Sequence, residues 1–119
     1  MKKIMMQGKI HGAKVTDCNL DYEGSLSLDE TLMIEAGMVP YEQVHIYNKS
    51  NGERFVTYLI KAERDSGFVG VNGAASHKAE VGHELIIVAY GLMEKDEIDF
   101  FTPRVVIVDD KNQIVNIKK

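Results

Sequence analysis

The sequence predicts a mainly β protein, a small β-barrel with one or two short helices. Many short stretches have the residue pattern of strands and are separated by turn residues, whereas only one stretch has a clear helical pattern. The 119 residues contain no internal repeat, linker or low-complexity segment, which predicts one domain covering 1–119. These observations do not distinguish a particular barrel from an OB-fold or a β-sandwich.

The first elements are an extended segment and the one clear helix. Residues 4–15 have an extended pattern interrupted by two glycines. Ser27 and Glu30 have the spacing of a capping box, which predicts a helix with Ser27 as its N-cap. Gly37 follows as the residue that ends the helix. The apolar positions in between recur at helical spacing: Leu28, Leu32, Met33 and Ala36.

The middle of the chain predicts a hairpin and a short strand. Residues 44–47 and 54–61 are strand-like, and the Asn51-Gly52 pair between them is a strong hairpin signal. Residues 68–71 form a further short strand. It ends at a run of small residues, 72–75, that allows the backbone to approach a ligand closely.

The last third predicts three more strands. Residues 85–90 form a nearly continuous apolar run suited to burial on both faces, and 94–99 is an acidic, solvated segment. Residues 105–108 and 114–117 are strands on either side of a turn. Pro103 fits directly before a strand, where its missing N–H donor does little harm.

Composition limits the class of protein. The hydrophobic fraction of 45% is enough for a core that needs no stabilising cross-links. The single cysteine, Cys18, excludes an intrachain disulfide and fits a reducing, cytoplasmic location. A net charge of -4 without a long basic run argues against nucleic-acid binding. No apolar run approaches the roughly 20 residues that cross a bilayer, and polar residues interrupt the N-terminus too early for a secretory signal.

The dipeptide Gly24-Ser25 is a candidate site for cleavage of the chain by its own side chain. Without a Cβ, Gly24 leaves its carbonyl group open to attack by the Ser25 hydroxyl, and it tolerates the backbone geometry that such an attack needs. An acyl shift from nitrogen to oxygen, followed by elimination, would leave a pyruvoyl group at position 25. The same dipeptide is common in ordinary turns, so it does not establish this chemistry alone.

Several further motifs accompany this dipeptide in register, at residues 6–11, 13–16, 22–25, 51–58, 62–64 and 71–75. Together they closely resemble the bacterial aspartate 1-decarboxylase family, pyruvoyl enzymes that convert L-aspartate to β-alanine for pantothenate synthesis. The resemblance runs without a gap over residues 1 to 89 and fades from Tyr90 onward.

The resemblance implies a fold, a cofactor and an assembly. It implies a double-psi β-barrel, usually a homotetramer with active sites between adjacent subunits. It also implies autocatalytic cleavage between Gly24 and Ser25 into 1–24 and 25–119, with the pyruvoyl cofactor derived from Ser25. The chemistry agrees, because a carbonyl cofactor that condenses with the substrate amine accepts the electrons left by decarboxylation. Whether an accessory maturation factor is needed stays open.

Two cations are candidates for binding the carboxylates of the substrate. Arg54 offers a planar fork that matches a carboxylate, and Lys9 offers a point charge. Each residue taken alone would suit a solvated surface position, and the resemblance implies that both line the site. Which of the two binds which carboxylate stays open.

Tyr58 matches the family's proton donor, and Thr57 matches a residue that contacts substrate and assists cleavage. On a straight strand, Arg54 and Tyr58 share one face and Thr57 points to the other. All three serve one site only if the strand twists or if more than one subunit contributes.

The remaining candidates surround these residues. Gly73, Ala74 and Ala75 correspond to the family's substrate-contacting backbone, and supporting roles are assigned to His11, Tyr22 and Asn72. Tyr47 stands where the family often carries tryptophan, which affects the expected pocket shape. The other histidines lack the spacing of a metal site, so no metal is expected: His45, His77 and His83.

Two other functions stay open at this point. One is a non-enzymatic β-barrel module that binds a small anion or a protein partner and is never cleaved. The other is a pyruvoyl decarboxylase for another acidic amino acid, because glutamate differs from aspartate by a single methylene.

Overall fold

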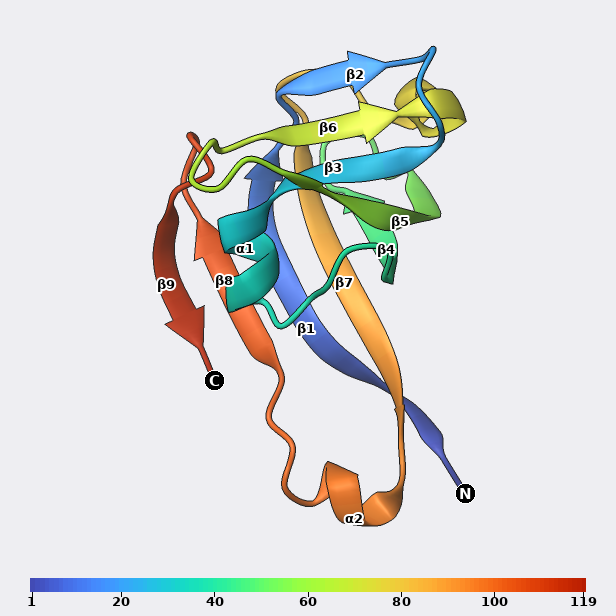
Figure 1. Ribbon diagram of the computed structural model, residues 1–119, viewed down its shortest axis with the longest axis vertical. Helices are drawn as coiled ribbons and strands as arrows, with labels where there is room; N and C mark the ends of the chain where they lie inside the picture. The colour runs from blue at the N-terminus through green and yellow to red at the C-terminus, as the bar shows by residue number, and fades with distance from the viewer.

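Nine strands, two short α-helices and one 3-10 helix make up the computed structural model, which describes residues 1–119 (Figure 1). The elements are β1 (Lys3–Lys14), β2 (Asp17–Asn19), β3 (Ser25–Asp29), α1 (Glu30–Glu35), β4 (Gln43–Asn48), β5 (Arg54–Ala62), β6 (Val69–Asn72), η1 (Gly73–Lys78), β7 (Glu84–Met93), α2 (Lys95–Ile98), β8 (Arg104–Val108) and β9 (Ile114–Lys118). This confirms the predicted mainly β fold with short helices. None of the helices is long and apolar enough to cross a lipid bilayer.

The strands are hydrogen-bonded in the order β2-β6-β3-β5-β4-β7-β1-β8-β9. Most neighbours are antiparallel, but three pairs are parallel: β1 with β8, β2 with β6, and β3 with β5. Figure 1 shows β2, β6, β3 and β5 crossing one end of the long β1–β7 pair, whose other end extends toward α2. The mixed pairing excludes a simple meander, in which sequential strands would all pair antiparallel. The double-psi name for this topology rests on the family resemblance.

Alternation along the strands separates a core face from an outer face. In β4, Val44 and Ile46 are fully buried, whereas His45 and Tyr47, which alternate with them, are half-buried on the other side. The same alternation places Leu59 of β5 and Ile87 of β7 in the core. A single cluster of 20 buried apolar residues results, and the opposite face of β1, β7, β4 and β5 is free to carry polar and aromatic groups.

The predicted start of the first helix is wrong. Ser27 lies within β3, and α1 begins at Glu30 with Asp29 as its N-cap, whose carboxylate accepts the N–H of Thr31 at 2.9 Å. The period-two burial of Leu26 and Leu28 in a strand paired on both sides outweighs the local capping signal. The predicted helix end is confirmed, because Gly37 follows the C-cap with φ +73°.

The other predicted elements are confirmed with small shifts of their ends. The strands predicted at 4–15, 44–47, 54–61, 68–71, 85–90, 105–108 and 114–117 correspond to β1, β4, β5, β6, β7, β8 and β9. Two strands, β2 and β3, were not predicted. The acidic segment 94–99 contains the short helix α2, and its Glu94 and Glu97 form a capping box.

Candidate active site

Ser25 is the first residue of β3, and its side chain is completely buried. Its hydroxyl donates to the carbonyl oxygen of Glu23 at 3.0 Å and accepts from Nδ2 of Asn72 at 3.1 Å. Asn72 lies directly opposite Ser25 on the neighbouring strand β6 and is itself buried. These contacts give the Ser25 oxygen one fixed orientation beside the peptide bond of Gly24.

The segment before Ser25 lies against the start of η1. Gly73 has φ +70°, and a Cβ there would come within 2.6 Å of the Cα and N of Gly24 and within 2.8 Å of the Tyr22 oxygen. Only a glycine fits this close approach. A Cβ at Gly24 would meet nothing within 4 Å, so the space that a side chain would occupy at Gly24 is open. Ala74 and Ala75 follow in the first turn of η1.

The register of β5 keeps the predicted strand parity. Tyr58 pairs with Gln43, Thr57 with the fully buried Val44, and Arg54 with Tyr47. Arg54 and Tyr58 therefore share the outer face, whereas Thr57 lies on the core side. Pairing of β5 with β3 begins at Leu59 opposite Leu26. The residues directly before that pair are Tyr58 and Ser25, so the two predicted catalytic residues occupy neighbouring positions on adjacent strands.

Lys9 and His11 lie on the same outer face, at the far side of the sheet. Through β7, the register places His11, Tyr47 and Arg54 in one row across the strands. Lys9 is in the next row, level with His45. However, β1 is four strands from β3, which is about 19 Å along the sheet at about 4.8 Å per strand. Along this sheet, the structure does not bring Lys9 and His11 to Ser25.

Aromatic contacts hold Arg54 on this face. Its Cζ lies 4.8 Å from the centre of the Tyr47 ring, in the geometry of a cation–π contact. The Tyr47 hydroxyl is 2.7 Å from the Tyr90 hydroxyl, and this hydrogen bond, with partial burial, raises the pKa of Tyr90.

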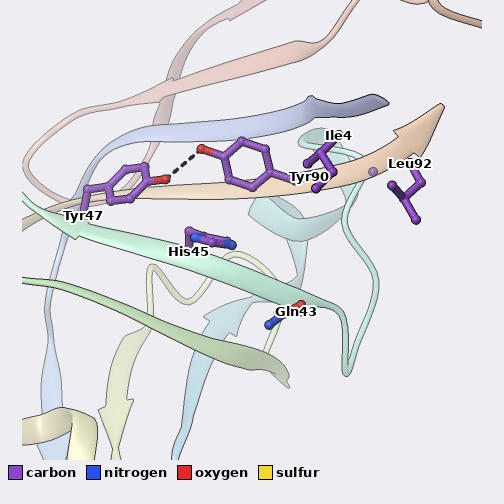
Figure 2. A pocket seen from close by; sticks show the side chains of 7 residues that line it. Ile4, Gln43, His45, Tyr47, Tyr90 and Leu92 are labelled. Atoms are coloured by element: carbon purple, nitrogen blue, oxygen red, sulfur yellow. Dashed lines mark hydrogen bonds between the residues drawn. The ribbon is translucent and has the colours of Figure 1, made fainter. Parts of the chain in front are cut away.

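The larger of two pockets, about 590 Å³, opens on the outer face beside these tyrosines (Figure 2). Its lining residues are Ile4, Gln43, His45, Tyr47, Tyr90, Gly91 and Leu92. None of them is among the predicted catalytic or substrate-binding residues, and only Tyr47 was expected to affect the shape of a pocket. Tyr47 connects the pocket to Arg54, and its place opposite Arg54 follows from the hairpin, whereas no sequence signal identified Tyr90 as its partner. The structure contains no group of three or more His, Cys, Asp or Glu residues arranged to hold a metal ion.

Comparison with known proteins adds independent information. The family model described as aspartate decarboxylase matches residues 1–115. The match therefore continues well past Tyr90, and the expectation that the resemblance fades there is wrong. A solved structure of the rationally designed protein mkDPBB_sym_86 covers 66% of this chain and 91% of its own, at 14% identity and a TM-score of 0.48.

Curated relatives match over nearly their full length. A protein of Nitrosococcus oceani named aspartate 1-decarboxylase is 50% identical over 112 residues, 94% of this chain and 89% of its own. Proteins of the same name from Tolumonas auensis and Bordetella avium are 49% and 47% identical over all 119 residues, 94% and 98% of their own lengths. This chain belongs to the aspartate decarboxylase family.

Proposed function

We propose that this chain decarboxylates L-aspartate to β-alanine and CO₂, using a pyruvoyl group formed from its own Ser25. The observation that carries the proposal is the buried Ser25 hydroxyl, held by Glu23 and Asn72 directly after Gly24. The name that its relatives share supports aspartate as the substrate. The product β-alanine would serve pantothenate synthesis.

The residues around position 25 fit a pyruvoyl group. Asn72 aims an amide N–H donor at the Ser25 oxygen, and Gly73 lets the backbone at Gly24 pack closely against the start of η1. When present, the group supplies a carbonyl that accepts the electron pair left on the α-carbon when CO₂ departs. A buried position with few charges suits such chemistry, since burial excludes competing water.

The same contacts support self-cleavage. The Ser25 oxygen attacks the carbonyl carbon of Gly24, the Gly24–Ser25 peptide bond breaks, and Gly24 becomes an ester of Ser25. Elimination then removes the Cα proton of Ser25 and breaks the bond from its Cβ to this oxygen, which leaves with Gly24 as a carboxylate and a Cα=Cβ double bond behind. Addition of water and loss of ammonia at residue 25 complete the pyruvoyl group. Asn72 holds the attacking oxygen, and Thr57 assists from the core side of β5.

The other side chains bind and protonate the substrate. Arg54 and Lys9 bind its two carboxylates, and Tyr58 returns a proton to the α-carbon. The backbone of Gly73, Ala74 and Ala75 lines the site. Because Lys9 lies about 19 Å along the sheet from Ser25, we propose that a neighbouring subunit of a homotetramer supplies Lys9 and His11 to each site. We also propose a cytoplasmic location, because the lone Cys18 fits a reducing compartment.

The proposed reaction is tested by incubating the purified chain with L-aspartate and, separately, with L-glutamate. We expect β-alanine from aspartate and far less product from glutamate, with no product from the Ser25→Ala variant. Product from glutamate at an equal rate would favour a decarboxylase for another acidic amino acid. An intact chain that forms no product from either would favour the non-enzymatic binding module.

A further inference from the structure

Two tyrosine hydroxyls meet on the face that carries Arg54. Tyr47 comes from β4 and Tyr90 from β7, and their oxygens are 2.7 Å apart. Figure 2 shows the two side chains pointing toward one another across the strands. A contact this short between two hydroxyls is a hydrogen bond of ordinary length, and it fixes both rings.

The register explains why this contact orients the Tyr47 ring. Tyr47 pairs with Ile86 on β7, and Tyr90 is four residues farther along that strand, about 13 Å away at about 3.3 Å per residue. The two side chains must lean along the strands to meet, and each ring lies over the sheet. The Tyr47 ring then offers its face to Arg54, the residue directly opposite on β5.

His45 supports the same arrangement from between the two tyrosines. Its ring packs against the Tyr90 ring with 4.9 Å between centroids and an interplanar angle of 79°, an edge-to-face contact. The His45 and Tyr47 ring centroids are 6.4 Å apart. The Tyr47 ring is therefore held both by the Tyr90 hydroxyl and by the packing around it.

We propose that Tyr90 is a positioning residue that acts through Tyr47 on Arg54 and so sets the enzyme's affinity for the substrate carboxylate. Arg54 is exposed, so without support its side chain would sample many rotamers. A guanidinium already seated on a fixed ring loses less freedom when it binds a carboxylate. The inference rests on the proposed function, in which Arg54 binds substrate.

The test uses single hydroxyl deletions in the cleaved enzyme. For Tyr90→Phe and for Tyr47→Phe, we expect the KM for aspartate to rise about three- to tenfold with kcat nearly unchanged. The reason is that a less fixed Tyr47 ring holds Arg54 less firmly, which weakens substrate binding and leaves the chemical step unchanged. Succinate lacks the amino group and reports carboxylate binding alone, so its inhibition constant should rise by the same factor. Tyr41→Phe is the control, since Tyr41 is exposed and does not line this pocket.

The double variant Tyr47→Phe/Tyr90→Phe separates positioning from general damage. Both single changes remove the same hydrogen bond, so the double change should be no worse than either single one. Unchanged KM and succinate inhibition in both single variants would overturn the inference, as would effects that multiply in the double variant. Failure of the wild-type chain to form β-alanine would instead overturn the proposed function, so the two failures are distinguishable.

Discussion

Arg54 lies exposed on the outer face with its guanidinium over an aromatic ring, and the type of cation should matter there as much as the charge. Arg54→Lys keeps the charge but loses the planar fork that binds a carboxylate with two parallel hydrogen bonds. We expect kcat/KM for aspartate to fall about tenfold or more, which is about 1.4 kcal/mol. Steady-state kinetics on the cleaved variant measures this, and an unchanged value would remove Arg54 from the substrate site.

Tyr58 occupies the position next to Ser25 on the adjacent strand, and its phenol is expected to matter for turnover and not for maturation. Tyr58→Phe should still be cleaved at Gly24-Ser25, yet its kcat should fall at least about a hundredfold, the low end for general acid catalysis. The phenol of an ordinary packing tyrosine would contribute only about 1 kcal/mol of stability. A folded, cleaved variant with near wild-type kcat would show that another group donates the proton.

Among individual residues, the sequence predicted the parts of the site that lie close along one strand or within one motif. The opposite faces of Arg54 and Thr57 follow from strand periodicity, and the structure confirms them. The contact between Tyr47 and Tyr90 joins residues 43 apart in the chain. Such a contact depends on which strands become neighbours, and no local pattern encodes that.

The 3-10 helix η1 packs against the segment for which we propose cleavage. Gly73→Ala should slow or prevent cleavage, because the added methyl group would displace the backbone at Gly24 and Tyr22. Gly37→Ala is a matched control, since Gly37 has a similar φ of +73° but a methyl group added there would meet nothing within 4 Å.

Both substitutions carry the same backbone strain of about 1–2 kcal/mol and should lower Tm similarly from that source. Only Gly73→Ala should alter the rate at which the intact chain disappears, followed by mass spectrometry after expression. Equal cleavage rates in the two variants would mean that contact with η1 does not position the scissile bond.

The first helix shows where local signals fail. Ser27 and Glu30 have the capping-box spacing, but the Ser27 hydroxyl accepts from Asn72 at 2.9 Å and its backbone belongs to β3. Asp29 is the actual cap, and it also accepts the backbone N–H groups of Asp65 and Gly67. Both partners lie more than 30 residues from Asp29 in the sequence. The choice of Asp29 over Ser27 as the N-cap therefore depends on tertiary structure.

Across the whole molecule, one ion cluster ties distant strands together. Glu84 at the start of β7 accepts from Lys14 of β1 at 3.1 Å and from Lys49, after β4, at 3.3 Å. The hydrogen bond from Lys14 in particular lowers the pKa of Glu84 below its ordinary value of 4.5.

A carboxyl group with a lowered pKa in the folded state stabilises the fold above the unfolded-state value, and this contribution is lost as pH falls through the folded-state pKa. Glu84→Gln should therefore lose less stability than the wild type between about pH 6 and about pH 3, by at most about 1 kcal/mol. Urea unfolding midpoints at the two pH values measure the difference. Parallel losses in both proteins would show that this cluster contributes nothing to acid sensitivity.

The order of the strands in the sheet could not be predicted from the local sequence patterns. Each strand other than β2 and β3 was recognised from its own pattern, but the separation of Lys9 from Ser25 by three intervening strands is a property of the topology alone. Because of this separation, the sheet of one chain does not bring all the predicted site residues together. It is the structural reason for proposing that a second subunit contributes.

Conversion of Ser25 into the cofactor can be tested by measuring the intact mass of the chain under denaturing conditions. The wild-type chain should split into 1–24 and 25–119, and the larger fragment should be lighter than a plain hydrolysis product by the mass of one ammonia. Ser25→Ala should stay whole because the attacking oxygen is gone. A wild-type chain that stays intact while forming β-alanine, or a Ser25→Ala chain cleaved at the same bond, would show that Ser25 is not the source of the cofactor.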